Sequence, residues 1–116
     1  MRVEVNFSPE SVKANTTSSV EMTVTVFSTS EYPMWYEMEV RVPPALSLLP
    51  AANTGSARSR IGIADGREAV SRTLKVHTDH NTSPHLYKID LTVFGYDKGA
   101  VIKDRADTHA HLRAES

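Results

Sequence analysis

Histidine is the residue type in this chain best suited to chemistry, since five histidines occur among 116 residues. His77, His80 and His85 lie within nine residues around one expected turn, and Asp79 lies among them. Imidazole nitrogens and carboxylate oxygens are ligands that zinc and copper(II) accept. The segment therefore holds possible metal ligands, although exposed polar positions on a strand and a loop explain the same pattern.

A second histidine pair lies near the end of the chain. His109 and His111 are two residues apart, so on a strand their side chains share one face, which Asp107 joins. The metal-site hypothesis takes ligands from both segments: His77, Asp79, His80, His109 and His111. Ordinary polar strand positions give the same spacing, so the favoured interpretation includes no cofactor.

Motifs typical of catalysis are not found in the sequence. It contains no G-x-S-x-G, no H-E-x-x-H and no glycine-rich phosphate loop. Glu37 and Glu39 would share a strand face, but the polar faces of strands commonly carry such pairs. The sequence therefore predicts a protein that is not an enzyme.

An apolar group follows the polar segment Ser28–Glu31. It consists of Tyr32, Pro33, Met34 and Trp35. Alternation predicts that Trp35 points to the polar face of its strand, and exposed aromatic residues are enriched at interfaces. We therefore predict a partner surface at Tyr32, Met34 and Trp35, with a core or loop-covered position for the aromatic ring as the alternative.

The sequence also contains acceptor patterns for N-glycosylation. Asn15-Thr16-Thr17 and Asn81-Thr82-Ser83 fall in expected turns, where a glycan would fit, so Asn15 and Asn81 are candidate sites. A third pattern begins at Asn6, but Pro9 follows it and disfavours it.

Composition limits the kind of protein this can be. A length of 116 residues predicts one domain, residues 1–116. The net charge of −1 and the scattered basic residues argue against nucleic acid as a partner. There is no cysteine and no apolar run long enough to span a membrane. Because no signal peptide is visible at Met1, we expect either an intracellular protein or a piece of a longer, exported one.

Alternation of apolar and polar residues predicts an all-β fold. Three segments show it most clearly, and each places four apolar side chains on one face. These sets are Val20, Met22, Val24 and Val26; Tyr36, Met38, Val40 and Val42; and Tyr87, Ile89, Leu91 and Val93. Segments with one apolar face need a second sheet to cover them, which a sandwich provides.

Other segments are less clear. Residues 51–66 favour an edge strand, and a hairpin turn is expected over 96–100, with Gly99 in a left-handed conformation before a last strand over 101–112. Residues 67–78 fit a helix face capped by Asp65 or a strand in which Arg72 would point inward. The neighbouring strands favour the strand.

The first half of the chain resembles the immunoglobulin-like modules of bacteria and archaea, of the CARDB and S-layer-associated kind. The matching pieces are Asn6-Phe7-Ser8-Pro9, the strand over 20–26, and Val40 to Leu46 with its proline pair. The position of Tyr87, two residues before Ile89, is similar to the tyrosine corner of immunoglobulin domains. The resemblance implies adhesion, spacing or accessory binding, usually outside the cell.

These observations together predict an immunoglobulin-like antiparallel β-sandwich of about seven strands. The predicted function is that of a non-catalytic interaction or structural module, which binds a protein partner or associates with itself. Two alternatives remain: a small histidine-based metal-binding domain, and a cytoplasmic accessory subunit that pairs through its edge strands.

Overall fold

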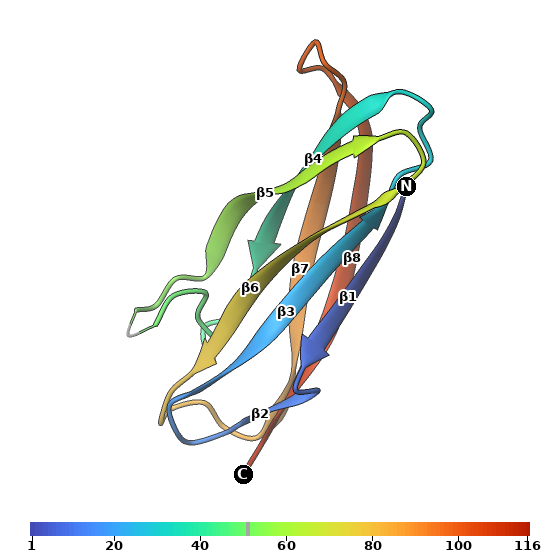
Figure 1. The fold of residues 1–116 in the computed structure, drawn as a ribbon. Coiled ribbons are helices and arrows are strands. Elements are labelled where there is room, and N and C mark those ends of the chain that lie inside the picture. The colour runs from blue at the N-terminus through green and yellow to red at the C-terminus, as the bar shows by residue number, and fades with distance from the viewer. Residues whose placement is uncertain (51) are drawn as a thin grey trace.

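The chain folds into two β-sheets that enclose one apolar core, as a computed structural model shows for residues 1–50 and 52–116 (Figure 1). The described residues contain strands and no helix, so the all-β prediction is confirmed. There are eight strands, one more than expected: β1 (Arg2–Ser8), β2 (Ser11–Lys13), β3 (Ser18–Phe27), β4 (Pro33–Arg41), β5 (Ser56–Asp65), β6 (Ala69–Thr78), β7 (His85–Tyr96) and β8 (Ile102–Glu115). In these described ranges, no helix has the length and apolar character that crossing a bilayer requires.

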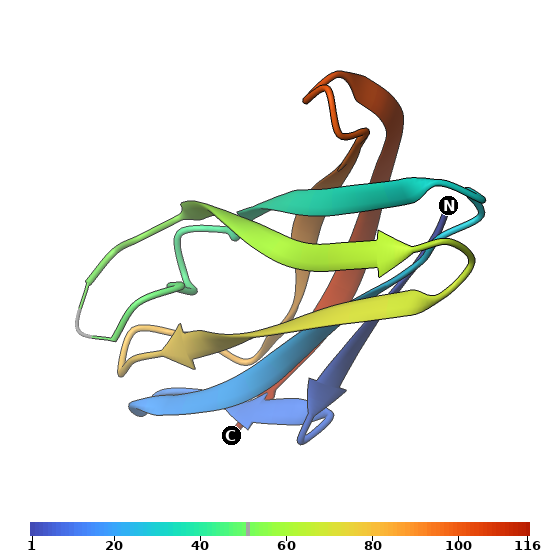
Figure 2. The same cartoon turned by 45° about the horizontal axis from the view of Figure 1, so that its top comes forward.

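The strands are distributed over a three-stranded and a five-stranded sheet. The three-stranded sheet has the order β1-β3-β6, and the five-stranded sheet the order β2-β8-β7-β4-β5. All neighbouring strands are antiparallel except β2, which runs parallel to β8. Among these strands, the chain passes from one sheet to the other five times: between β1 and β2, β2 and β3, β3 and β4, β5 and β6, and β6 and β7. The connection between β5 and β6 lies at the right of Figure 2.

The three alternating segments form the centre of the core, as the sequence predicts. All twelve of their apolar side chains are buried, and they come from β3 of the three-stranded sheet and from the adjacent inner strands β4 and β7 of the five-stranded sheet, with Val42 directly after β4. Tyr36 is 1% exposed, and its hydroxyl donates a 2.7 Å hydrogen bond to Ser28 Oγ. Its hydroxyl group is therefore satisfied inside the core, which is the usual condition for burying a tyrosine.

The tyrosine corner is present at the start of β7. The buried Tyr87 hydroxyl donates a 2.7 Å hydrogen bond to the carbonyl oxygen of Ser83, four residues upstream. This bond ties the preceding turn to the strand, and it agrees with the feature expected from the sequence. Ile89, two residues further on, is fully buried.

Residues 67–78 contain strand β6, so the strand interpretation is confirmed and the helix alternative is wrong. Arg72 pairs with the buried Val24 and therefore starts on the core-facing side of the sheet, yet it is exposed. This is possible because β6 is the edge of its sheet, where a long side chain can reach solvent. Beside it, a Cβ at Gly62 of β5 would lie 3.3 Å from Val70 Cβ, so the missing side chain lets the two sheets approach.

The hairpin between β7 and β8 differs from the expectation in its detail. The residue with positive φ is Ala100, at 57°, and not Gly99. Asp97 explains the difference, because its carboxylate accepts hydrogen bonds from the backbone N–H groups of Gly99 and Val101 and holds the loop in place. Close by, the register of β7 with β8 shifts between Gly95 and Tyr96, whose partners are Asp104 and Ile102.

Candidate functional site

The outer face of the five-stranded sheet carries an unusual set of aromatic rings. Trp35 on β4 stacks on Tyr96 of β7, with ring centroids 4.1 Å apart and planes 12° apart. The guanidinium of Arg60 on β5 lies over the Trp35 ring, 5.0 Å from its centroid. The prediction that Trp35 lies on the outer face and Tyr36 in the core is confirmed.

Phe94 continues this arrangement along β7. Arg58 of β5 lies 4.8 Å from its ring centroid, and Arg105 of β8 lies 5.6 Å from it. Guanidinium groups are attracted to aromatic faces by the ring quadrupole, and they also hold the rings in place. The face is therefore a layer of rings and arginines that spans β5, β4, β7 and β8.

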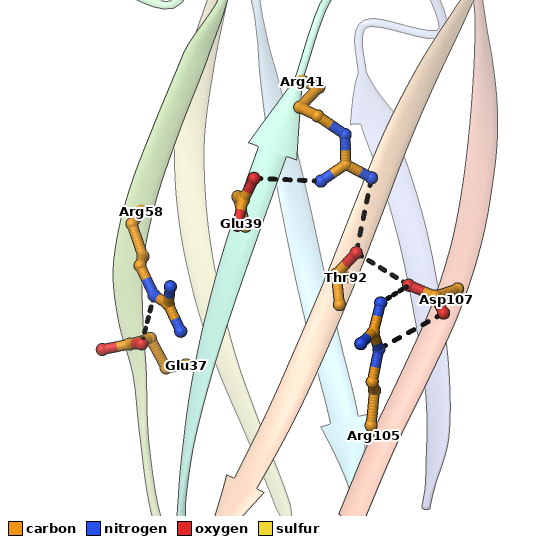
Figure 3. Close-up of polar contacts among 7 residues, drawn as sticks. All are labelled: Glu37, Glu39, Arg41, Arg58, Thr92, Arg105 and Asp107. Carbon is orange, nitrogen blue, oxygen red and sulfur yellow. Dashed lines mark hydrogen bonds and ion pairs between the residues drawn. The ribbon is translucent and has the colours of Figure 1, made fainter.

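Polar side chains next to the rings form two separate groups, an Arg58–Glu37 pair and a chain of contacts from Glu39 to Arg105, which we together call the polar network (Figure 3). Arg58 pairs with Glu37, and Arg41 pairs with Glu39 at 3.2 Å. Arg41 also donates to Thr92, whose hydroxyl donates a 2.8 Å hydrogen bond to Asp107. The two glutamates that share a strand face are thus each held by an arginine, and they do not form a pair of free carboxylates.

The network changes the acid–base properties of two of its members. The hydroxyl of Thr92 donates to the Asp107 carboxylate and lowers its pKa, and Arg105 adds to this effect. The bond to Glu37 raises the pKa of Arg58, with a smaller contribution from Tyr96. Both shifts favour the charged forms of these two residues.

One end of this face is apolar and open to solvent. Tyr32 is 77% exposed and Ile63 is 63% exposed. A groove of about 470 Å³ runs beside Tyr32 and Pro33, with Lys98 and Lys103 among the residues that line it. A smaller groove of about 190 Å³ lies against Trp35 and Ile63. We call the set Tyr32, Pro33, Trp35 and Ile63 the apolar corner.

Of the residues of the predicted partner surface, Tyr32, Met34 and Trp35, the structure fully exposes only Tyr32. Met34 is 7% exposed, because its side chain points inward from β4 and lines the grooves from below. Trp35 is half-buried by its stacking partner Tyr96. Ile63 belongs to the exposed set instead, and the sequence suggested it only as an apolar residue of an edge strand.

The histidines and Asp79 proposed as metal ligands do not come together. His77, Asp79 and His80 line a pocket of about 300 Å³ at the end of β6, in the part of the molecule opposite the hairpin of β7 and β8. His109 and His111 lie on the outer face of β8, with ring centroids 5.3 Å apart. Over residues 1–50 and 52–116, no three histidine, aspartate or glutamate side chains are placed to hold a metal ion.

His77 provides a testable pH dependence. Its side chain is partly desolvated, which lowers its pKa, and Lys75 adds a smaller repulsion. Between the folded and unfolded pKa values the unfolded chain binds more protons, so stability falls as the pH drops below about 6.5. We expect His77→Gln to reduce this loss in melting temperature between neutral and mildly acidic pH. Equal losses in both proteins would contradict the assignment, and His80→Gln is the control.

The two candidate glycosylation sites lie in neighbouring turns. The backbone N–H of Asn15 donates a 2.7 Å hydrogen bond to the carbonyl oxygen of Thr82, so the two acceptor patterns meet at one end of the molecule. Asn15 and Asn81 are both exposed. Thr82 is fully buried, where its hydroxyl binds the carbonyl oxygen of Ala45 at 2.7 Å. Glycosylation remains a prediction at these two accessible side chains.

Several members of the aromatic and arginine layer were missed in the sequence. Phe94 and Tyr96 continue the polar face of the strand that begins at Tyr87, and Arg58 and Arg60 are two residues apart. The period of two could have assigned each pair to one face. It could not have shown that the pairs meet on one sheet, because that depends on the strand order β5-β4-β7.

Comparison with known proteins supports the fold more than a function. No family model matches the chain, and no curated protein matches it. Among solved structures it is similar to self-complemented MyfA, the major subunit of the Myf fimbriae of Yersinia enterocolitica, with a TM-score of 0.55 and 15% identity over 100% of both chains. AvmM, which catalyses macrocyclization in alchivemycin A biosynthesis, gives a TM-score of 0.49 and 9% identity over 99% of this chain and 88% of that one.

The likeness to MyfA concerns the arrangement of the strands, since so low an identity carries no residue of a site from one chain to the other. It agrees with a sandwich of two sheets. The resemblance to CARDB and S-layer-associated modules remains a prediction from the sequence.

Proposed function

We propose that this chain is an immunoglobulin-like β-sandwich that acts as a non-catalytic interaction or structural module and contacts a protein partner through its apolar corner. The observation that carries this proposal is the exposure of Tyr32 and Ile63, 77% and 63%, beside the stacked Trp35 and Tyr96. Exposed apolar side chains next to a rigid aromatic pair resemble the anchor residues of protein interfaces.

The surroundings of the corner support a protein as the partner. Trp35 is held between Tyr96 and Arg60, so its position is set before any partner arrives. A pre-ordered side chain loses little entropy on binding. The grooves beside Tyr32 and Ile63 offer concave apolar surface for a partner's side chain, and Lys98 lines both.

The polar network supports a role without catalysis. Glu37, Glu39 and Asp107 are each held by an arginine or a threonine hydroxyl, so none of them is a free carboxylate. A general acid or base needs a pKa near the working pH, whereas the pKa of Asp107 is lowered further from it. A fimbrial subunit is among the proteins that use a similar fold, and an envelope location for this chain is part of the proposal.

Photo-crosslinking in the native host tests the corner. A photoreactive phenylalanine analogue at Tyr32 is expected to give one discrete adduct, whereas the same analogue at Leu86, 44% exposed on the same sheet, gives none. An adduct from position 86 but not from position 32, or none from either, would refute the assignment of the corner.

A double substitution tests the contribution of the apolar corner to partner binding in solution. We expect Tyr32→Ser with Ile63→Thr to weaken partner binding by at least about tenfold, since such anchors each contribute about 1–2 kcal/mol or more. Because both side chains are exposed, the free energy of unfolding should change by less than about 0.5 kcal/mol. Urea unfolding of the double variant checks the second value, and a large loss of stability would mean that the corner is part of the core.

A further inference from the structure

We propose that the free edge of β8 pairs with the same edge of a second copy of this chain, in antiparallel orientation. This inference extends the proposed function, because it names a partner for the module, but it does not need the apolar corner. The edge in question runs from Ile102 to Leu112 (Figure 1). In the five-stranded sheet, β8 has β7 on one side along its whole length, but β2 covers the other side only at Arg113–Glu115.

The backbone groups that lie free on this edge can be identified. On the β2 side, the carbonyl oxygen of Glu115 accepts a 2.7 Å hydrogen bond from Ala14 N–H. The N–H and C=O of one strand residue point to the same side, and the direction alternates along the strand. The β7–β8 register is regular from Ala114 back to Asp104, so Arg105, Asp107, His109 and His111 direct their backbone groups outward. The N–H of Arg105 already donates a 2.9 Å hydrogen bond to Asp104 Oδ1, so the N–H groups open to a new strand are those of Asp107, His109 and His111. In the described part of the chain no strand pairs with them.

Between Arg105 and His111, this edge lacks the features that protect the edge strands β5 and β6. Natural edge strands avoid pairing through inward-pointing charges, bulges, prolines or short length. β6 carries the inward Arg72, and β5 has a register shift beside Tyr36 and Glu37 and lies against β6 at Gly62. From 105 to 111, β8 contains no proline, and its inward side chains are the small residues Ala106, Thr108 and Ala110.

The side chains on the outer face make the edge complementary to itself. An antiparallel pair centred on Thr108 uses every free residue, because it places Asp107 opposite His109 of the second copy and Arg105 opposite His111. The Asp107 and His109 contact occurs twice by symmetry and joins a carboxylate to an imidazole. On the inner face Ala106 meets Ala110, so no bulky side chain opposes another. Two five-stranded sheets would then form one continuous sheet.

Sedimentation over a range of protein concentrations tests this edge. We expect a dimer that His109→Pro weakens by at least about tenfold, because proline removes an outward N–H from both copies. His109→Ala keeps that N–H and is expected to retain most of the affinity. Proline is tolerated on an edge strand where its missing N–H faces solvent, so the variant should fold.

Amide exchange on the unaltered protein gives a second test that does not depend on a folded variant. The N–H groups of Asp107, His109 and His111 should become protected as the dimer forms. A monomer at every concentration with fast exchange at these three residues would overturn the proposal, as would a dimer unaffected by His109→Pro. The Tyr32→Ser variant separates the two proposals, because it should leave the dimer intact while it weakens crosslinking at the corner.

Discussion

Tyr36→Ala should lower the free energy of unfolding by roughly 3–5 kcal/mol, which is the usual cost of removing a buried aromatic side chain. Tyr36 is 1% exposed and lies at the centre of the five-stranded sheet, where β4 pairs with both β5 and β7. Its loss would leave a cavity between the sheets and would free Ser28 Oγ from its 2.7 Å hydrogen bond. Since domains of this size are stable by only about 5–15 kcal/mol, the variant would be close to unfolding.

Two further variants, compared by urea unfolding, show how much of this loss comes from the buried ring of Tyr36 and how much from its hydroxyl group. Tyr36→Phe should cost about 1 kcal/mol, because only one hydrogen bond is lost. Tyr32→Ala makes the same chemical change at an exposed position and should shift stability by less than about 0.5 kcal/mol. Equal losses from Tyr36→Ala and Tyr32→Ala would show that Tyr36 does not support the core.

Gly95→Ala is expected to lower the free energy of unfolding by about 1–3 kcal/mol, because the added methyl group crowds its neighbours in the core. No existing contact is removed by this change. A Cβ at position 95 would lie 2.9 Å from Tyr36 Cε1, 3.0 Å from Met34 Cε and 3.3 Å from Asp104 Cβ. Met34 can move, but the Tyr36 ring is enclosed and Asp104 Cβ is fixed to the neighbouring strand. The added methyl group must therefore displace β7 or the ring.

Gly55→Ala is the matched control for this prediction. The nearest atom to a Cβ there is the carbonyl oxygen of Val42 at 3.6 Å, which is an ordinary contact distance. That change should be neutral, or stabilising by up to about 1 kcal/mol, because alanine restricts the unfolded chain more than glycine does. The comparison is made by thermal or urea unfolding, and equal effects of the two changes would contradict the packing described at Gly95.

The sequence predicted the centre of the fold well because one physical rule governs it. Strand side chains alternate with period two, and a buried face shows this rule directly as apolar residues at every second position. The apolar sets of β3, β4 and β7 are buried as expected for this reason. The same rule placed Trp35 outside and Tyr36 inside before any strand order was known.

The predictions that the structure does not match concern features that depend on contacts between residues distant in the sequence. The five residues proposed to bind a metal form two groups along the chain, but the fold keeps these groups apart. His77 lies on β6 with Asp79 and His80 in the turn that follows, whereas His109 and His111 lie on β8 of the other sheet. The stacking of Tyr96 on Trp35 requires the β4–β7 register, and the sequence assigned Tyr96 to a turn. The positive φ of Ala100 follows from the hydrogen bonds of Asp97, whereas residue preference pointed to Gly99.

The strand order also determines when this protein can complete its fold during synthesis. Met1 is bound through its amino group to Asp104, 103 residues later, and β2 finds its partner only at Arg113–Glu115. A ribosome releases the chain from its N-terminus, so β1 and β3 can pair early while β2 has nothing to bind. The five-stranded sheet is therefore complete only after β8 has emerged, and until then the nascent chain exposes part of the inner faces of β3 and β4.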